Sequence, residues 1–335
     1  MSAAGRCWGI TDGSAGMVSQ VRALATVLGR TPEMKTIALN SLFSWQPNIF
    51  YAVGYRQLIL DYALDKSRSD ALDPPWPELI ISCGRKAALI TMGMRWRAEQ
   101  RQAATPLATR FIHIQHPQCS PANYDLVIAM AHDKLSADNV ITTRYALHQI
   151  TPEVLDKARA QYAPRFASLP KPHIGVLIGG STNKYTLRRG AVEIVVHQLE
   201  RLLHKTIGSL LITTSRRTGD ANTALLADAF RGNPRVYFYN GVGDNPYLGL
   251  LAQADYLAVT NDSVNMMSEA VATGKPLYII PFANHIRTKP ADFAERLMAE
   301  GIARPIGDGV QPWSYTVDNE MVGLAATVKA KLGIA

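Results

Sequence analysis

The chain has 335 residues, of which 47% are hydrophobic and 19% charged, and its 35 basic and 27 acidic side chains give a net charge of +8. This length favours two domains, and the composition excludes a disordered chain. A basic chain suits an anionic partner such as a nucleotide, a phosphate, an anionic lipid or a nucleic acid. Because its lysines and arginines form no dense tract, we expect no nucleic-acid partner.

Cysteine spacing and hydropathy indicate the compartment. Cys7, Cys83 and Cys119 are widely spaced and form no CxxC pair, which fits a reducing cytosol and predicts neither a disulfide framework nor a structural zinc site. No secretory signal is evident, and no run approaches the roughly 18 apolar residues of a transmembrane helix. The aromatic-rich segment 42–64 is either a packed helix or a membrane-surface contact. We expect a cytoplasmic protein, with peripheral contact at the inner membrane as an open alternative.

The first half of the chain alternates short apolar strands with helices. In chain order the expected elements are a strand at 7–11, a helix at about 18–28, a strand at 79–82, a helix at 87–97, and strands at 111–114 and 126–129. Each strand ends in small or polar residues. This alternation predicts a parallel, doubly wound sheet.

The second half repeats the pattern after a break. Segment 163–173 contains three prolines and no apolar periodicity, which is typical of a linker. Strands are then expected at 174–178, 210–214, 236–239, 256–260 and 277–280. We predict an α/β fold of two Rossmann-like, doubly wound domains, 1–165 and 172–310, facing across a cleft. The remaining segment, 311–335, is expected to hold a helix that packs back on the first domain.

Residues 255–281 form the most informative part of the chain, a predicted strand–helix–strand unit. Asn261, Asp262 and Ser263 lie between the strand and the helix, where free N–H groups and the helix dipole favour an anion. Glu269 lies too deep in the helix to cap its start. It is either an exposed helix residue or faces the crevice together with Asn265.

Three other strand ends carry turns that suit a phosphate group. Two are glycine-rich, which lets the backbone approach a ligand closely, and the third offers paired arginines for bidentate contacts. Their candidate ligand-contacting residues are Gly13, Ser14, Gly16, Gly179, Gly180, Ser181, Thr182, Ser215, Arg216 and Arg217. Neither glycine-rich turn is a complete GxGxxG or Walker A loop. A tight turn at 13–16 and a solvated surface at 215–217 stay open as plainer interpretations.

Acid–base candidates lie at strand ends of the first half: Asp12, His116, His132 and Asp133. Asp12 and His116 are the preferred catalytic pair. His113 is expected inside a strand and therefore in the core. The chain has no HExxH, GxSxG or DxD motif, so we expect no metal and no cofactor.

The motifs together resemble a known family. They are TDGSAG at 11–16 with Gln20, SCGR at 82–85, IQHP at 114–117, IGGST at 178–182, SRRT at 215–218, NPY at 245–247, TNDSV at 260–264, SEA at 268–270 and TGKP at 273–276. Over residues 7–305 this set resembles the bacterial and plant proteins named after the plant mitochondrial-fission factor "elongated mitochondria". That name reports a plant phenotype and specifies no chemistry.

The family is similar to GT-B glycosyltransferases, which implies a nucleotide-sugar site in the C-terminal domain. By this resemblance the loop Gly179–Thr182 lies near the donor phosphates, Asn261 to Ser263 cradle the diphosphate, and Glu269 binds ribose or sugar hydroxyls. The turn at 13–16 would face that site across the cleft. The Asn261-Asp262 pair departs from the small residues usual before the serine, so the donor stays unspecified.

The resemblance implies a metal-independent glycosyltransferase that moves a sugar from a nucleotide-diphosphate donor, its co-substrate, to an unknown glycan, lipid or protein acceptor. Envelope or glycolipid synthesis is the expected setting. A nucleotide-sugar 2-epimerase and a non-catalytic nucleotide-binding scaffold remain alternatives.

Overall fold

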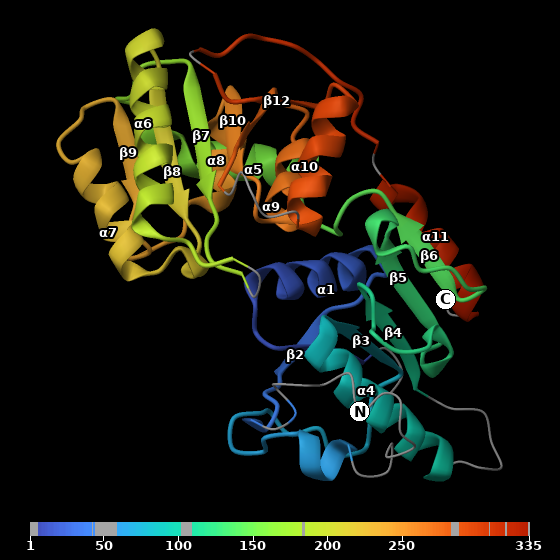
Figure 1. The fold of residues 1–335 in the computed structure, drawn as a ribbon. Helices are drawn as coiled ribbons and strands as arrows, with labels where there is room; N and C mark the ends of the chain where they lie inside the picture. The colour runs from blue at the N-terminus through green and yellow to red at the C-terminus, as the bar shows by residue number, and fades with distance from the viewer. Residues whose placement is uncertain are drawn as a thin grey trace. The chain divides into compact units, whose positions relative to one another are not determined.

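The computed structural model describes residues 6–41, 43, 59–101, 109–182, 185–282, 288–307, 309–318 and 320–333. Most of segment 42–64, for which we weighed membrane contact, lies outside this range. The chain forms two compact units (Figure 1), one made of Met1–Gln149 with Asn319–Ala335 and the other of Ile150–Asp318. Each unit holds a six-stranded parallel sheet, which confirms the two expected Rossmann-like domains.

The first sheet has the strand order β2-β1-β3-β4-β5-β6. Its strands are β1 (Cys7–Thr11), β2 (Pro32–Thr36), β3 (Leu79–Cys83), β4 (Arg110–Ile114), β5 (Leu126–Met130) and β6 (Val140–Thr143). Its helices are α1 (Ala15–Val27), α4 (Arg85–Arg101) and α11 (Glu320–Leu332), with short turns at η2 (Ile59–Ala63), η3 (Pro121–Asn123) and η4 (Ala131–Asp133).

Helices cover both faces of this sheet, so its central strands are mostly apolar. Trp8, Ile10 and Ile80 pack in the cluster that includes α4 residues. The alternate positions of β1 and β3, such as Cys7 and Ile81, pack in the cluster that includes α1 and α11. Burial on both faces explains why β1, β3 and β5 are continuous apolar runs rather than alternating ones.

The C-terminal helix α11 returns to the first unit. Leu324 and Val328 are buried in the cluster with α1. The Glu320 carboxylate accepts hydrogen bonds from the backbone N–H groups of Arg144, at 2.8 and 2.9 Å, and Tyr145, at 3.2 Å. Apolar packing and backbone hydrogen bonds therefore both attach α11 to this sheet.

The second sheet has the order β12-β11-β10-β7-β8-β9. Its strands are β7 (His173–Ile178), β8 (Ser209–Thr214), β9 (Val236–Tyr239), β10 (Tyr256–Thr260), β11 (Leu277–Ile280) and β12 (Ala303–Pro305). Its helices are α5 (Pro152–Phe166), α6 (Arg189–Lys205), α7 (Asp220–Ala229), α8 (Tyr247–Gln253), α9 (Val264–Ala272) and α10 (Lys289–Ala299), with a short turn at η5 (Arg216–Thr218).

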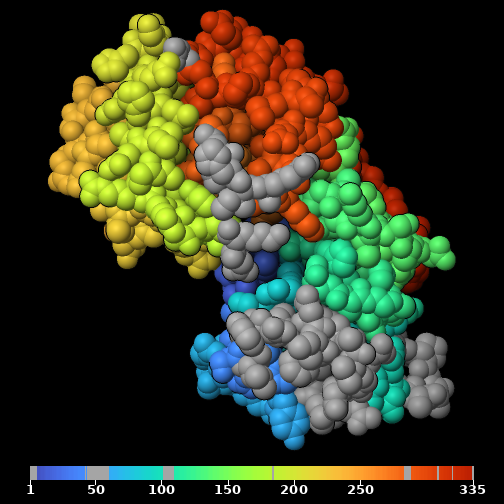
Figure 2. All heavy atoms as spheres, in the orientation of Figure 1, coloured from blue at the N-terminus to red at the C-terminus, as the bar shows by residue number. Residues whose placement is uncertain are grey.

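Helices also cover the second sheet on both faces. On one face Ile174, Val176 and Ile178 of β7 pack with residues of α6. On the other face the end of α8 lies so close to β7 that a Cβ at Gly175 would stand 3.1 Å from the side chain of Ala254, the C-cap residue of α8. Figure 2 shows α6 and α7 (yellow to gold) and α10 (orange) on the surface of this unit.

The chain passes between the units before α5, whereas the prolines of segment 163–173 suggest a linker further along. Pro164 lies near the end of α5. Tyr162 on the same helix packs over Gly249 of α8, where a Cβ would stand 2.4 Å from the Tyr162 ring. This close contact makes α5 part of the second unit. No helix in the described part of the chain is long and apolar enough to cross a bilayer.

Candidate functional site

The candidate site lies at the carboxyl edge of the second sheet, where the strand order reverses. β7 and β10 are adjacent parallel strands, but β7 connects onward to β8 on one side and β10 to β11 on the other. Ligands of open α/β sheets bind at such reversal points. The loops that follow β7, β8 and β10 contain the predicted residues of this domain other than Glu269.

Asp262 joins these three loops. Its carboxylate accepts hydrogen bonds from the backbone N–H of Gly180 at 2.9 Å and the Thr260 hydroxyl at 2.6 Å. It also forms an ion pair with Arg217 at 3.0 Å, and only 6% of its side chain is exposed. The structure therefore places Asp262 inside the loop framework, with its charge directed at Arg217.

The two glycines after β7 are required by this close packing. A Cβ at Gly179 would lie 2.1 Å from the Asp262 carboxylate oxygens, and one at Gly180 would lie 2.1 Å from the backbone of Arg217. No side chain fits at either distance, so the Gly-Gly sequence allows the loops to touch. The two glycines, which the sequence suggested would let a ligand approach the backbone, are therefore required by the contact between the loops.

The arginines after β8 have different environments. The Arg217 guanidinium donates to the carbonyl oxygens of Gly180 and Ser181, at 3.4 and 3.1 Å, as well as to Asp262. Arg216 is exposed. Ser215 begins the η5 turn and exchanges hydrogen bonds with Thr218 in a capping box. Arg217 therefore holds the loop, and Arg216 is presented to solvent.

Ser181 and Thr182 complete the loop after β7. The Ser181 N–H donates to the carbonyl of Arg217 at 2.9 Å, and its hydroxyl accepts from the N–H of Leu187 at 3.0 Å. Thr182 forms an isolated bridge with Tyr185. These bonds hold Ser181 and Thr182 against the neighbouring segments.

Ser263 and Asn261 set the start of α9. The Ser263 hydroxyl accepts from the N–H of Met266 at 3.4 Å, so Ser263 is the N-cap. The Asn261 side-chain oxygen accepts from the N–H of Phe282 at 2.9 Å, which ties the end of β10 to the end of β11. Both predicted residues therefore position the N-terminus of α9 at the reversal point.

Glu269 is paired with a residue whose role the sequence interpretation missed. The Tyr247 hydroxyl donates to the Glu269 carboxylate at 2.5 Å. Desolvation and the negative charge of Glu269 raise the pKa of Tyr247 well above its usual value, so the phenol stays a donor. The Asn245-Pro246-Tyr247 motif at the start of α8 was the only hint of this role in the sequence. The sequence could not show that Tyr247 contacts Glu269, because Glu269 lies on another helix, α9.

In the first unit, Asp12 contacts the neighbouring turn residue Ser14, whereas the candidate His116 bonds to Gln118 instead. The Asp12 carboxylate accepts from the Ser14 N–H at 3.1 Å and hydroxyl at 2.6 Å, and pairs with Lys86 at 3.3 Å. Burial alone would raise the pKa of Asp12, but the Ser14 hydrogen bonds and the Lys86 charge outweigh it and lower the pKa. Gly13 has a φ of 79° and makes this turn possible, and Gly16 lies in the first turn of α1.

The histidines at the strand ends differ in what they can do. The Nδ1 atom of His116 accepts from the N–H of Gln118 at 2.9 Å, so a neutral ring carries its proton on Nε2 and presents a donor. His132 and Asp133 lie 3.8 Å apart in η4. His113 is fully buried, bonds to Ser82 at 2.8 Å, and burial lowers its pKa to about 3, so it is a core residue.

Comparisons with known proteins give relatives at the level of sequence. The family model for Mitochondrial fission ELM1 matches residues 15–332. The Mitochondrial fission protein ELM1 of Arabidopsis thaliana is 32% identical over 282 residues, which is 76% of this chain but 64% of the plant protein's length. The uncharacterized protein RP120 of Rickettsia prowazekii is 25% identical over 366 residues and covers 98% of both chains.

Solved structures share the fold at low identity. An S. aureus MnaA–UDP co-structure has a TM-score of 0.52 and 11% identity, covering 97% of this chain and 87% of that one. The UDP-GlcNAc 2-epimerase of Neisseria meningitidis bound to UDP-GlcNAc has a TM-score of 0.52 and 12% identity, covering 98% and 91%. The likeness establishes a GT-B-like fold, and the match of the family model to most of the chain shows that this protein belongs to the Mitochondrial fission ELM1 family.

Proposed function

We propose that the protein binds a nucleotide-diphosphate sugar at the carboxyl edge of its second sheet and transfers the sugar to an acceptor. The observation that carries the proposal is the meeting of three loops at the reversal point, beside the capped N-terminus of α9. Helix N-termini at such points bind phosphate through free N–H groups and the helix dipole.

In this proposal the diphosphate contacts the first turn of α9 and Arg216. Arg217 is engaged by Asp262 and by the Ser181 carbonyl, and Arg216 lies one residue away in the same exposed turn. Asp262 would repel a phosphate that approached its carboxylate. We therefore assign Asp262 and Arg217 to holding the Gly179–Thr182 loop, and Arg216 to phosphate contact.

Glu269 would accept hydrogen bonds from ribose or sugar hydroxyls. Tyr247 donates to one of its carboxylate oxygens, which orients the carboxylate. Asp12 and His116 remain the candidates for acid–base chemistry. Of these two, His116 would donate a hydrogen bond from Nε2 to a reacting group and ionised Asp12 would orient a donor group.

A second candidate function is nucleotide-sugar 2-epimerisation. It is favoured because several solved structures with TM-scores above 0.5 to this chain are described as UDP-GlcNAc 2-epimerases. Labelled UDP-GlcNAc distinguishes the two reactions, because epimerisation changes the sugar without an acceptor and transfer requires one. Transfer predicts free nucleoside diphosphate and a labelled acceptor from a lipid or glycan extract.

Nucleotide binding is tested first by thermal shift with UDP, GDP, ADP and CMP sugars. A ligand at about 100 times its Kd stabilises the folded state by about 2.7 kcal/mol, which raises the melting temperature by a few degrees. Stabilisation by one nucleotide class is the expected result. No response to any of the four would contradict both the proposed function and a nucleotide-binding scaffold.

A further inference from the structure

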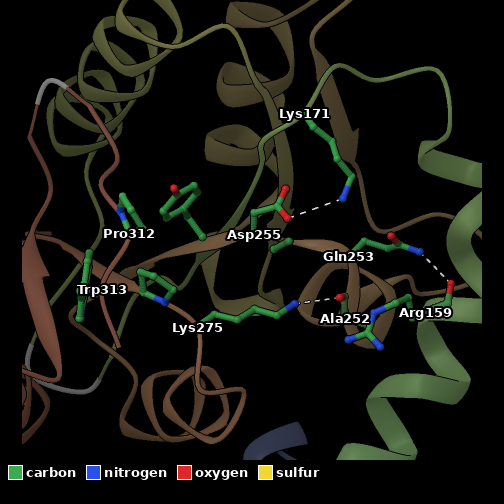
Figure 3. A pocket seen from close by; sticks show the side chains of 11 residues that line it. Arg159, Lys171, Ala252, Gln253, Asp255, Lys275, Pro312 and Trp313 are labelled. Atoms are coloured by element: carbon green, nitrogen blue, oxygen red, sulfur yellow. Dashed lines mark hydrogen bonds and ion pairs between the residues drawn. The ribbon is translucent and has the colours of Figure 1, made fainter. Parts of the chain in front are cut away.

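A cavity of about 440 Å³ opens at the amino edge of the second sheet, opposite the candidate nucleotide site (Figure 3). Four segments reach it from the sheet side: the residue Lys171 before β7, residues 252–256 between α8 and β10, Lys275 and Pro276 before β11, and Arg159 of α5. Pro312 and Trp313, after β12, form its remaining wall. All of these residues belong to the second unit.

The lining of this cavity has more positive than negative charge. Arg159, Lys171 and Lys275 line the cavity together with one carboxylate, that of Asp255, and Arg159 also pairs with Asp156, which lies outside the lining. Asp255 accepts from the N–H of His173 at 2.7 Å through one oxygen and lies 3.6 Å from Lys171 through the other. Its single charge is thus shared with the backbone and Lys171, and the lining retains a net positive charge.

Lys275 is the least compensated cation of the three. Its ammonium donates to the carbonyl oxygens of Leu251 and Ala252 at 2.6 and 2.8 Å, at the end of α8. Among the described residues no carboxylate lies within 4.0 Å of it. Desolvation and the nearby charge of Arg159 lower its pKa to about 8, and the Asp255 carboxylate opposes this shift only in part. An anion in the cavity would supply the missing counter-charge.

The opposite wall is aromatic and offers a hydrogen-bond donor. The Arg304 guanidinium lies 4.2 Å from the centre of the Trp313 ring, and Tyr278 packs edge-on against it at 5.1 Å. The Trp313 indole nitrogen is buried and has no hydrogen-bond partner in the described part of the chain. A buried N–H without a partner is unfavourable, so a ligand whose acceptor atom reached this nitrogen would gain a hydrogen bond.

We propose that this cavity is a second anion site, which binds a phosphate group through Arg159, Lys171 and Lys275 beside the Trp313 ring. Several cations arranged around one opening suit an anion that carries several oxygen atoms. The phosphate can belong to a soluble phosphomonoester or to a phospholipid headgroup. The inference is independent of the proposed nucleotide site.

Fluorine NMR of the full-length protein labelled with fluorotryptophan tests this proposal. The Trp313 signal is identified among five tryptophans by its loss in Trp313→Phe. Titration with inorganic phosphate should shift that signal saturably, and sodium chloride at equal ionic strength should not. No saturable shift would overturn the proposal.

Matched variants assign the effect to the cavity. Arg159→Gln with Lys171→Gln should weaken phosphate binding at least about tenfold, because two charged contacts are lost. Lys157→Gln with Lys205→Gln removes the same charge from exposed positions outside the lining and should leave the titration unchanged. Ser263→Ala should also leave it unchanged, which separates this site from the nucleotide site. Equal titrations in both double variants would refute the assignment.

The source of the phosphate group is then distinguished with two probes. Glycerol phosphate is titrated in solution, and vesicles of phosphatidylglycerol are compared with vesicles of phosphatidylcholine in a sedimentation assay. If the wild-type protein sediments with the anionic vesicles and the Arg159→Gln, Lys171→Gln variant does not, the phosphate belongs to a lipid headgroup. A saturable shift with glycerol phosphate, without vesicle retention, identifies a soluble phosphomonoester.

Discussion

At the residue scale, the loop framework around Asp262 depends on close contacts that a sequence does not reveal. Small and polar residues after apolar strands predict a ligand site, and their placement at one sheet edge follows from the parallel topology. The direction of each side chain does not follow. Asp262 contacts Gly180 and Arg217 because the loops after β7, β8 and β10 meet, and these lie far apart in the chain.

Gly180→Ala tests this framework. The added methyl would lie 2.1 Å from the Arg217 backbone, so the loops must separate. We expect a loss of about 1–3 kcal/mol in the free energy of unfolding, measured by urea denaturation, together with weaker nucleotide binding. Gly190→Ala is the control, because a Cβ there meets no described atom within 4 Å. Equal unfolding curves for the two variants would contradict the close packing.

Tyr247→Phe tests the pairing with Glu269. Removing the phenol deletes the 2.5 Å hydrogen bond that helps to orient the Glu269 carboxylate. We expect nucleoside-diphosphate affinity, measured by calorimetry, to fall by about tenfold, the equivalent of roughly 1.4 kcal/mol. Tyr239→Phe, which removes a hydroxyl bonded to the carbonyl of Gly243, is the control. Unchanged affinity in Tyr247→Phe would show that Tyr247 does not position Glu269.

At the element scale, the sequence predicts buried strands well and edge strands poorly. The central strands β1, β3, β5 and β7 are apolar because helices cover both faces of each sheet. The edge strand β2 has the sequence PEMKT, whose proline and charges are typical of a sheet edge and hide its strand character. The prolines of segment 163–173 suggest a linker, but Pro164 lies inside the helix α5.

The burial of His113 in β4 should make the stability of the fold decrease at acidic pH. Its pKa of about 3 in the folded state lies below the ordinary 6.5, so the unfolded chain binds the proton first as pH falls. Stability is fully present above about pH 6.5 and decreases towards pH 3, by up to about 1.4 kcal/mol per pH unit. Urea denaturation at several pH values measures this slope. His113→Phe should reduce it, whereas exposed His197→Gln should not. Equal slopes in the wild type and His113→Phe would contradict the assignment.

At the scale of the whole molecule, two units with separate cores are joined by a chain that returns through α11. The repeated strand–helix pattern predicts both sheets, and the TDGSAG, GGST and TNDSV motifs predict the family. The sequence places the passage between units later than the structure does, because the contact of α5 with α8 is tertiary.

Leu324→Ala tests the return of α11 to the first unit. Leu324 is buried with α1, and its truncation should lower the free energy of unfolding of that unit by about 2–4 kcal/mol. Val322→Ala, at a residue that is 76% exposed, should change it by less than about 0.5 kcal/mol. Because α11 belongs to the first unit, nucleotide affinity should be unchanged in both variants. Reduced affinity in Leu324→Ala alone would show that α11 also affects the nucleotide site.

The most direct test of the proposed site is calorimetric titration with UDP, the ligand of the MnaA co-structure of the same fold, followed by GDP, ADP and CMP. We predict that one of them binds, and that Ser263→Ala weakens it about fivefold through loss of the α9 cap, worth about 1 kcal/mol. Glu269→Gln should weaken it further, whereas Glu295→Gln on the exposed side of α10 should bind as the wild type does. Wild-type affinity in both Ser263→Ala and Glu269→Gln, or no binding by any of the four nucleotides, would contradict a nucleotide site at this edge of the sheet.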